Sequence, residues 1–541
     1  MVVDSGRVLV IAGSDCSGGA GLEADQKTIA AHGCYAMAAT TALTVQDTTA
    51  VYDIHPVPPE FVVKQIDICI KDIGTDAIKI GMLASEETAR AVAKVLKSHN
   101  VENIVLDPVM ISTSGSQLLP NEAVKAVAEG LVPQATIITP NLPEAKLLAE
   151  IVQDSSAPKE IESIEDVEKM AERIRCLGPK WVLLKGGHLP LTKDLTVAEP
   201  GVEGREPEYI VDVLCGEGQL IRIQSAYQES RNTHGTGCTL ACKQDGTILA
   251  HPSETSPLTP FLEYTAAIAS NLAKQCDVPS AVHAACRYIQ PAIATAPGYG
   301  KGHGPLNHFH SCFQLPFSRG YFIEYLLSRE DVKPVWDSFV HHPFVMGLGD
   351  GSLPLESFKG YIIQDYLYLI HFARAHALAA YKATNMKNIS RSNEIVAHIF
   401  RESSLHIDYC KSFGISVEEI ENTPEKQACT AYTRFLLDVG HSQDLLALQV
   451  ALAPCTLGYG AVAKMLYNHP NTKKDAKDNI YWTWIENYVA EDYVEATRIA
   501  SEQLESEVGR QTPERIEELV QIFIQGTQVS RPHIVGSVIA D

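Results

Sequence analysis

The stretch "IAGSDCSGGAGLEAD" (11–25) has the pattern of a strand, a glycine turn and the start of a helix. Gly18, Gly19 and Gly21 give the backbone of this turn the freedom to approach a ligand closely. The G-x-x-x-x-G-K-[ST] pattern of a P-loop is absent. By itself the turn leaves two interpretations open, a binding turn and a purely structural one.

Strand-like and helical segments alternate from residue 7 to about residue 310. The strand-like segments are short apolar runs that end in Gly, Pro or a polar turn: "RVLVIAG" (7–13), "AIKIGML" (77–83), "NIVLDPVM" (103–110), "ATIITP" (135–140) and "WVLLKGG" (181–187). Helical patterns such as "ETARAVAKVLKSH" (87–99) lie between them. This alternation predicts an α/β domain, with a mostly parallel sheet covered by helices on both faces. Ligands of such sheets bind beyond the carboxyl ends of the strands.

The pattern changes after about residue 315. Long Leu- and Ala-rich segments with helical spacing follow, such as "ESFKGYIIQDYLYLIHFARAHALAAY" (356–381), and there is almost no strand signal. These segments predict a bundle of α-helices. We therefore predict two domains, 1–312 and 313–541, with their boundary in "HFHSCFQLPFSRG" (308–320).

The charge balance narrows the classes of partner. The chain has 541 residues, with 44 Lys and Arg against 66 Asp and Glu, which gives a net charge of −22. This balance argues against a nucleic-acid binder and against binding to an anionic membrane surface, but not against anionic small ligands. The 13 cysteines form no CxxC pair, the N-terminus has too short an apolar run for a signal peptide, and we expect that no segment approaches a membrane span. These features predict a cytosolic protein.

A second glycine-rich turn, "NTHGTGCTL" (232–240), is more specific. Glycines alternate with small polar residues ahead of an apolar helix, so several free N–H groups would lie at the helix N-terminus. The amides and the helix dipole favour an anion there. Cys238 falls in the first helical turn, where the same field lowers the pKa of a thiol.

Two other turns follow predicted strands. "TPNLPEAKLL" (139–148) places Asn141 and Glu144 at a turn into a helix, which suits water-mediated Mg²⁺ binding beside a phosphate chain. An ordinary helix start with an acidic first turn is the alternative interpretation of this segment. "LLKGGH" (183–188) places Lys185 beside two glycines, as a point charge for a phosphate.

Together these motifs resemble the hydroxymethylpyrimidine and phosphomethylpyrimidine kinases, a family of the ribokinase superfamily. The resemblance also uses "TALTVQDT", "KIGML", "VLDPVM" and "GKGHGPLNHFH", and it covers nearly all of 7–311 in order. It implies ATP- and Mg²⁺-dependent phosphorylation of hydroxymethylpyrimidine and then of its monophosphate. A B6-vitamer kinase is the alternative within the fold.

The resemblance also implies a pocket for the pyrimidine. Gln46 and Met82 would contact the ring. Val109 and the backbone of Gly13 would line the pocket. These four residues follow different predicted strands, so the fold has to bring them together.

The same resemblance implies the phosphate-handling residues. Asn141 and Glu144 would organise phosphate and Mg²⁺, with the metal held through Glu144 and water, and Lys185 would meet the ATP phosphates. Cys238 would help to deprotonate the hydroxymethyl group. Its amide would join an anion hole for the transferring phosphoryl group that also includes Gly235, Thr236 and Gly237.

About 24 residues, 243–266, interrupt the helix that should follow the anion turn. They include Pro252, Pro257 and Pro260, which a continuous helix would not tolerate. The segment is either a real surface insertion or a translated intron. The family pattern resumes cleanly at both ends, which favours the second interpretation.

The second half resembles the TenA, or thiaminase II, family from about residue 320 to residue 528, through 339–378, "AYTRFLLD" (431–438) and "ALAPCTLGYG" (451–460). Candidate site residues are Asp365 and Tyr368, three apart on one helical face, and Tyr432 on a later helix. Cys455 follows Pro454, which indicates a helix start and a thiolate. Core tyrosines and a filler cysteine are the alternative interpretation.

In this family the cysteine adds to the pyrimidine ring, an amine or thiazole leaves, and water replaces it. The Asp hydrogen-bonds the aminopyrimidine, and a Glu near the C-terminus protonates the leaving group. Ser530 stands where that Glu would be, and the family pattern is lost after Gln528. We therefore expect strongly reduced amine release, with ligand binding retained.

The two halves make chemical sense together, because hydrolysis of aminomethylpyrimidine would give the alcohol that the kinase phosphorylates. A non-catalytic pyrimidine-binding or regulatory paralogue is the competing hypothesis, and the departures at 243–266 and 529–541 are what support it. Members of these families usually assemble, so we expect a homo-oligomer.

Overall fold

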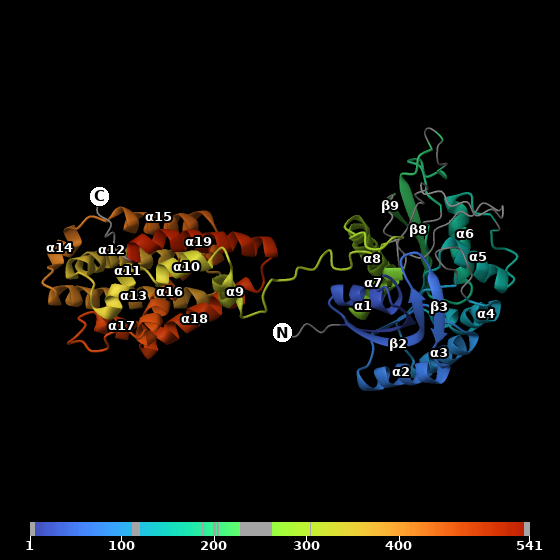
Figure 1. The fold of residues 1–541 in the computed structure, drawn as a ribbon. Helices are drawn as coiled ribbons and strands as arrows, with labels where there is room; N and C mark the ends of the chain where they lie inside the picture. Colours follow the sequence, from blue (N-terminus) through green and yellow to red (C-terminus); the bar gives the residue numbers. More distant parts are fainter. Residues whose placement is uncertain are drawn as a thin grey trace. The chain divides into compact units, whose positions relative to one another are not determined.

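The computed structural model describes residues 6–110, 119–158, 160–186, 189–198, 202, 205–227, 262–302 and 304–534. The chain divides into two compact units, Met1–Cys312 and Phe313–Asp541. Figure 1 shows strands only in the first unit, while the second consists of helices.

A nine-stranded sheet forms the centre of the first unit, in the order β3-β2-β1-β4-β5-β6-β7-β8-β9. Its strands are β1 (Arg7–Asp15), β2 (Tyr35–Gln46), β3 (Val51–Pro56), β4 (Ala77–Ile80), β5 (Ile104–Leu106), β6 (Ile137–Ile138), β7 (Trp181–Leu184), β8 (Tyr209–Gly216) and β9 (Gln219–Ala226). The six strands from β2 to β7 are parallel to their neighbours, and β3, β8 and β9 run antiparallel at the two edges. The predicted mostly parallel sheet is confirmed.

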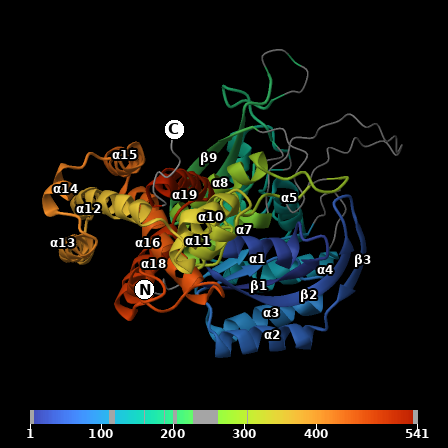
Figure 2. The same cartoon turned by 60° about the vertical axis from the view of Figure 1, so that its left-hand side comes forward.

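Helices cover both faces of this sheet. One face packs against α2 (Pro59–Asp72), α3 (Glu86–His99), α4 (Asn121–Gly130), α5 (Leu142–Ile151) and α6 (Ile164–Arg175), and the other against α1 (Gly21–Ala31), α7 (Leu262–Ala273) and α8 (Val278–Ala294). Figure 2 shows α2 and α3 on the opposite side of β1 and β2 from α1. Alternate residues of β1 serve the two cores: Leu9 packs with the first group and Val10 with the second. Double coverage explains why the strands are apolar throughout.

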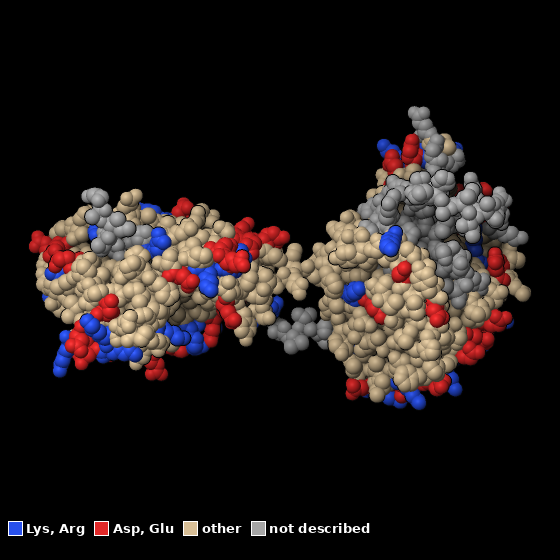
Figure 3. Space-filling model, in the orientation of Figure 1, with Lys and Arg blue, Asp and Glu red and all other residues tan. Residues whose placement is uncertain are grey.

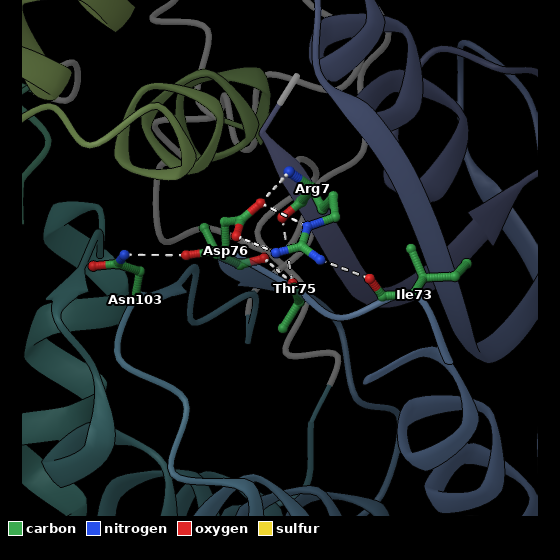
Figure 4. A network of polar contacts seen from close by, with 6 residues as sticks. Arg7, Ile73, Thr75, Asp76 and Asn103 are labelled. Carbon is green, nitrogen blue, oxygen red and sulfur yellow. Dashed lines mark hydrogen bonds and ion pairs between the residues drawn. The ribbon is translucent and has the colours of Figure 1, made fainter. Parts of the chain in front are cut away.

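A polar network holds the amino edge of the sheet together (Figure 4). Arg7, the first residue of β1, donates from Nε and Nη2 to the carboxylate of Asp76 at 2.9 and 2.6 Å. Its Nη1 donates to the carbonyl of Ile73 at 2.7 Å, and Asn103 donates to the carbonyl of Asp76 at 3.1 Å. Because Asp76 and Asn103 precede β4 and β5, the network fixes the starts of three neighbouring strands.

The second unit is all helical in its described residues, 313–534. Its helices are α9 (Phe322–Ser328), α10 (Lys333–Val340), α11 (Pro343–Asp350), α12 (Leu355–Lys382), α13 (Met386–Ser412), α14 (Val417–Asn422), α15 (Gln427–Ser442), α16 (Leu445–Asn468), α17 (Trp482–Val489), α18 (Glu491–Val508) and α19 (Pro513–Ile534). The predicted helical bundle is confirmed.

Helix α16 corrects one expectation. Over 18 residues its mean hydropathy reaches 1.6, so by length and composition it could cross a membrane, and the expectation that no segment approaches a membrane span was wrong. Within the unit, 67% of that window is buried. α16 packs against α15, α17, α18 and α19, and a helix surrounded by other helices is apolar on most sides.

Candidate active sites

Two of the predicted pyrimidine-pocket residues contact each other near the carboxyl ends of β1 and β4: Gly13 lies in the last part of β1, and Met82 follows β4. A Cβ atom on Gly13 would lie 2.6 Å from Cε of Met82, so a larger residue at this position would displace the end of the methionine side chain. Met82 is held from β2, because the hydroxyl of Thr41 donates to its carbonyl at 2.6 Å. Val109 is partly buried just past β5. Gln46 is the last residue of β2, where Cys16 Sγ lies 3.1 Å from its carbonyl oxygen.

The first glycine turn is occupied by the protein itself. The buried carboxylate of Asp15 accepts the backbone N–H groups of Ser17, Gly19 and Ala20 at 2.8, 3.2 and 2.8 Å. Gly18 has a φ of 76°, a left-handed conformation that favours glycine. Since these amides are already hydrogen-bonded to a carboxylate, the geometry supports the structural interpretation of this turn.

The ends of β5, β6 and β7 bring five polar side chains together. Asn141 begins α5 and forms a capping box with Glu144: each side chain accepts the other residue's backbone N–H, at 2.8 and 2.9 Å. The backbone of Lys185 forms an isolated parallel β-bridge with that of Asn141. Lys185 Nζ donates to Asp107 at 3.1 Å. Thr139 Oγ1 lies 3.3 Å from the same oxygen of Asp107.

Burial dominates the electrostatics of this cluster. Glu144, Lys185 and Asp107 are between 1 and 3% exposed. The pKa of Glu144 is raised to about 7, mainly by burial; the positive charge of Lys185 lowers it, and the negative charge of Asp107 raises it. Asp107 Oδ2 is buried and accepts no hydrogen bond from the part of the chain that the structure describes. An unused carboxylate oxygen beside a carboxyl that resists ionisation fits a divalent cation with oxygen ligands.

The anion turn lies outside the described residues. This applies to Gly235, Thr236, Gly237 and Cys238, and to 243–261 of the predicted interruption. The last residues of the predicted interruption, 262–266, are described, because α7 begins at Leu262. Tyr264, Thr265 and Ala266 are buried in the core.

In the helical unit, the structure places Asp365 in a polar network. This residue of α12 is buried, and its Oδ1 accepts the hydroxyl of Tyr459 at 2.8 Å. Its Oδ2 lies 3.0 Å from Nε2 of His406, on α13. The hydroxyl of Tyr361, one helical turn before Asp365, donates to Tyr459 at 3.4 Å. A carboxylate held on both oxygens by different helices has a fixed orientation.

The other predicted residues of this unit lie in the same core. The rings of Tyr368 and Tyr432 stack with centroids 5.4 Å apart and planes 6° from parallel. Burial raises the pKa of both phenols well above the usual value, and the proximity of Cys455 raises it further. The structure thus brings Tyr368, Tyr432 and Cys455 together, but it corrects the argument for Cys455. Pro454 does not begin a helix: both residues lie inside α16, far from its N-terminal dipole.

Ser530 is buried on α19, where its hydroxyl donates to the carbonyl of Thr527 at 3.1 Å. Gly526, one turn earlier, faces α16: a Cβ there would lie 3.2 Å from Cγ of Pro454. The face of α19 that contains Ser530 therefore continues a contact with α16 beside Cys455. At this position the residue brings a hydroxyl and no carboxylate.

Sequence reasoning missed Asp107, His406 and Tyr459. Two of them carried a signal. Asp107 directly follows a buried strand at the ligand edge, and Tyr459 is four residues after Cys455, hence on the same helical face. His406 carried none, because only the packing of α13 against α12 brings it to Asp365.

Two family models match the chain. The phosphomethylpyrimidine kinase model matches 15–246 and 263–307. The TENA/THI-4/PQQC family model matches 329–531. The first match stops and resumes around 247–262, inside the predicted interruption, and the second includes Ser530.

Two fungal relatives match this chain over almost its whole length, and a bacterial relative matches little more than half of it. A relative in Schizosaccharomyces pombe is 39% identical over 523 residues, which span 96% of this chain and 89% of the relative. The hydroxymethylpyrimidine/phosphomethylpyrimidine kinase THI20 of Saccharomyces cerevisiae is 32% identical, over 96% of this chain and 93% of that protein. The hydroxymethylpyrimidine/phosphomethylpyrimidine kinase of Bacillus subtilis is 33% identical over 56% of this chain and 94% of its own length.

Proposed function

We propose, because this chain belongs to the phosphomethylpyrimidine kinase family and carries a second domain of the TENA/THI-4/PQQC family, that it serves thiamine biosynthesis and salvage. Its first unit phosphorylates hydroxymethylpyrimidine and then the monophosphate, with ATP as donor. Its second unit binds aminopyrimidines and hydrolyses them weakly. The observation that carries the kinase assignment is the buried cluster of Asp107, Asn141, Glu144 and Lys185 at three adjacent strand ends.

In the kinase step, the alcohol oxygen attacks the γ-phosphorus of ATP while the bond to the ADP oxygen breaks, and the alcohol proton passes to Cys238. Lys185 supplies a fixed positive charge to the phosphates. Glu144 and Asp107 would hold Mg²⁺, partly through water, and bound Mg²⁺ neutralises charge on the phosphate chain. The anion hole also includes the amides of Gly235, Thr236, Gly237 and Cys238.

In this proposal the pyrimidine ring lies at the carboxyl ends of β1 and β4. Met82 packs on Gly13 there, so the side chain is already in place to contact the ring. Gln46 offers an amide to the polar edge of the pyrimidine, and Val109 closes the apolar side. A pocket with few polar groups among apolar ones orients a small ring.

In the second unit, Cys455 Sγ adds to an electron-poor ring carbon, and the amine on the exocyclic methylene leaves with a proton. A water molecule then adds to that methylene to give the alcohol, and the thiolate is expelled as the ring becomes aromatic again. Asp365 orients the aminopyrimidine, with Tyr368 and Tyr432 beside the ring. Ser530 offers no acid for the leaving amine, so we expect slow release with binding intact.

The kinase is tested by incubating the chain with hydroxymethylpyrimidine, ATP and Mg²⁺ and weighing the products by mass spectrometry. Mono- and diphosphate products from the full chain would show that residues 243–266 are a tolerated insertion. Products only after deletion of 243–266 would locate the fault in that segment. Lys185→Met should abolish product in whichever form is active. A lack of phosphorylated product from both forms would favour the hypothesis of a non-catalytic paralogue.

The second activity is tested by measuring ammonia release from aminomethylpyrimidine. Ser530→Glu should raise the rate at least about tenfold, because a general acid typically contributes 10²–10⁴-fold. Ser530→Gln, which has a similar size and no acid, is the matched control. Equal rates for the Glu and Gln variants would contradict the assigned place of the acid.

We further infer that the protein works as a cytosolic homo-oligomer on small pyrimidines, without nucleic-acid or membrane partners. The net charge of −22 supports the lack of polyanionic partners. On the face that Figure 3 shows, basic side chains lie in small groups beside acidic ones. Light scattering of the purified chain measures the oligomeric state, and a monomer would contradict this part of the proposal.

A further inference from the structure

Asp212, on β8, is buried and connects three elements of the kinase unit. Its Oδ1 accepts the backbone N–H of Gly186 at 2.8 Å. Its Oδ2 accepts the hydroxyl of Tyr264, on α7, at 3.1 Å. That hydroxyl also lies 2.7 Å from Sγ of Cys286, on α8. Both oxygens of the carboxylate are thus used inside the core.

The turn that Asp212 holds is the one that presents Lys185. The backbone N–H of Lys185 donates to the carbonyl of Pro140 at 3.0 Å, and the next N–H, of Gly186, goes to Asp212. The backbone of Gly186 lies close against β8, because a Cβ atom there would overlap the carbonyl oxygen of Val211. The Lys185 turn is therefore held by the segment after β6 on one side and by β8 on the other.

We propose that Asp212 is a positioning residue for the Lys185 turn, and that Tyr264 keeps Asp212 in place from α7. The inference rests on the proposed contact of Lys185 with the ATP phosphates. A hydrogen bond to a carboxylate is stronger than one to a neutral acceptor, so loss of Asp212 frees the turn that aims the ammonium group. Neither Asp212 nor Tyr264 is among the site residues predicted from the sequence.

The surroundings of the carboxylate support this role. Burial raises the pKa of Asp212, while the N–H of Gly186, the hydroxyl of Tyr264 and the charge of Lys185 lower it. The groups that favour its charged form are therefore the same groups that it would position. Tyr264 also lies inside the predicted interruption 243–266, yet it is 4% exposed, so at least this residue of the segment is part of the kinase core.

The test is the binding of AMP-PCP, a non-hydrolysable ATP analogue, to the full chain with Mg²⁺, measured by titration calorimetry. Asp212→Ala should weaken AMP-PCP binding about tenfold, in line with the loss of a charged hydrogen bond. Asp212→Asn, which keeps an oxygen for the N–H of Gly186, should bind within about threefold of the parent. Tyr264→Phe should weaken binding about threefold. Binding of hydroxymethylpyrimidine should stay unchanged in all three.

Tyr288→Phe is the matched control, because this tyrosine of α8 donates to the carbonyl of His308, away from the Lys185 turn. It should leave AMP-PCP binding unchanged. Lys185→Met separates the two ideas: if it leaves AMP-PCP binding intact, or if the parent does not bind, the proposed role of Lys185 fails and this inference with it. If Lys185→Met weakens binding and a folded Asp212→Ala does not, only the positioning role fails. Should Asp212→Ala not fold, parent-like binding by Tyr264→Phe overturns the inference.

Discussion

Glu144 has two tasks that oppose each other. It caps the first turn of α5 through the N–H of Asn141, a task that glutamine performs equally well. It also lies buried beside Asp107 and Lys185, where burial raises its pKa. A carboxyl that must ionise in such a place costs stability while the cation site is empty, and we read this cost as the mark of a functional residue.

The pH dependence of stability follows from this pKa. The ordinary value is 4.5 and the folded value is about 7, so the folded protein binds the extra proton between these two pH values. Stability from Glu144 therefore falls as the pH rises through this window. Glu144→Gln should gain on the parent between pH 5 and pH 8 by up to about 3 kcal/mol. Urea unfolding without nucleotide or Mg²⁺ measures the difference.

The matched control is Glu150→Gln, an exposed carboxylate at the other end of α5. Its stability difference from the parent should stay within about 0.5 kcal/mol at both pH values. A Glu144→Gln variant that tracks the parent at every pH would show that the Glu144 carboxyl is not held against ionisation.

The hydrogen bond from Tyr459 to Asp365 gives a further prediction. Its hydroxyl donates to Asp365 at 2.8 Å, so Tyr459→Phe leaves one oxygen of a buried carboxylate without this donor. The variant should lose about tenfold in aminopyrimidine affinity, which corresponds to about 1.4 kcal/mol. Tyr467→Phe, a half-exposed tyrosine of the same helix, should bind like the parent. Equal affinities for the two variants would contradict the role of Tyr459.

Individual residues show where sequence reasoning succeeds and where it ends. Lys185 directly follows β7, and Glu144 lies in the first turn of the helix that follows β6; the ends of parallel strands meet, so their proximity could be predicted. Cys455 was assigned to a helix start because proline usually breaks a helix, but a helix buried among others tolerates Pro454 in its interior. His406 depends on which helices pack together, and local sequence patterns do not contain that information.

Among the elements, the short apolar strands at the centre of the sheet and the amphipathic helices were predictable, and the sheet edges were not. β8 pairs antiparallel with β7, and β9 pairs antiparallel with β8, so the two strands extend the sheet beyond the predicted parallel part. The predicted run "ATIITP" (135–140) contains β6, but only Ile137–Ile138 of it form the strand.

The polar network at the amino ends of β1, β4 and β5 gives a prediction for the strands that it joins. The Arg7 guanidinium lowers the pKa of Asp76, so its contribution to stability is present above about pH 4 and is lost as the pH falls through the folded pKa. At pH 7, Asp76→Asn should cost about 1–2 kcal/mol, allowing for the solvent screening of a partly exposed pair. At pH 3 the difference should shrink, as urea unfolding would show.

Asp72→Asn, at the exposed end of α2, is the control for this change. It should move stability by less than about 0.5 kcal/mol. Asp76→Asn should leave AMP-PCP binding unchanged, because the polar network lies at the amino ends of the strands and the predicted site lies at their carboxyl ends. A large loss of nucleotide binding in a folded Asp76→Asn variant would contradict this separation of the two edges.

The whole molecule contains separate cores. One core cluster draws on residues from Phe322 onward, and the other two draw on residues up to Leu306. Residues 1–312 and 313–541, expressed as separate chains, should therefore each fold. Their two urea transitions should add up to the unfolding curve of the full chain. A shift of either midpoint in the full chain would show that the units stabilise each other.

Two independent cores also have a genetic meaning. A substitution that ends phosphoryl transfer, such as Lys185→Met, would leave the helical unit folded, and a change at Cys455 would leave the α/β unit folded. A cell that carried one allele of each kind would still make one working copy of either half. Lesions in the two halves of this gene should therefore complement each other, as lesions in two different genes do.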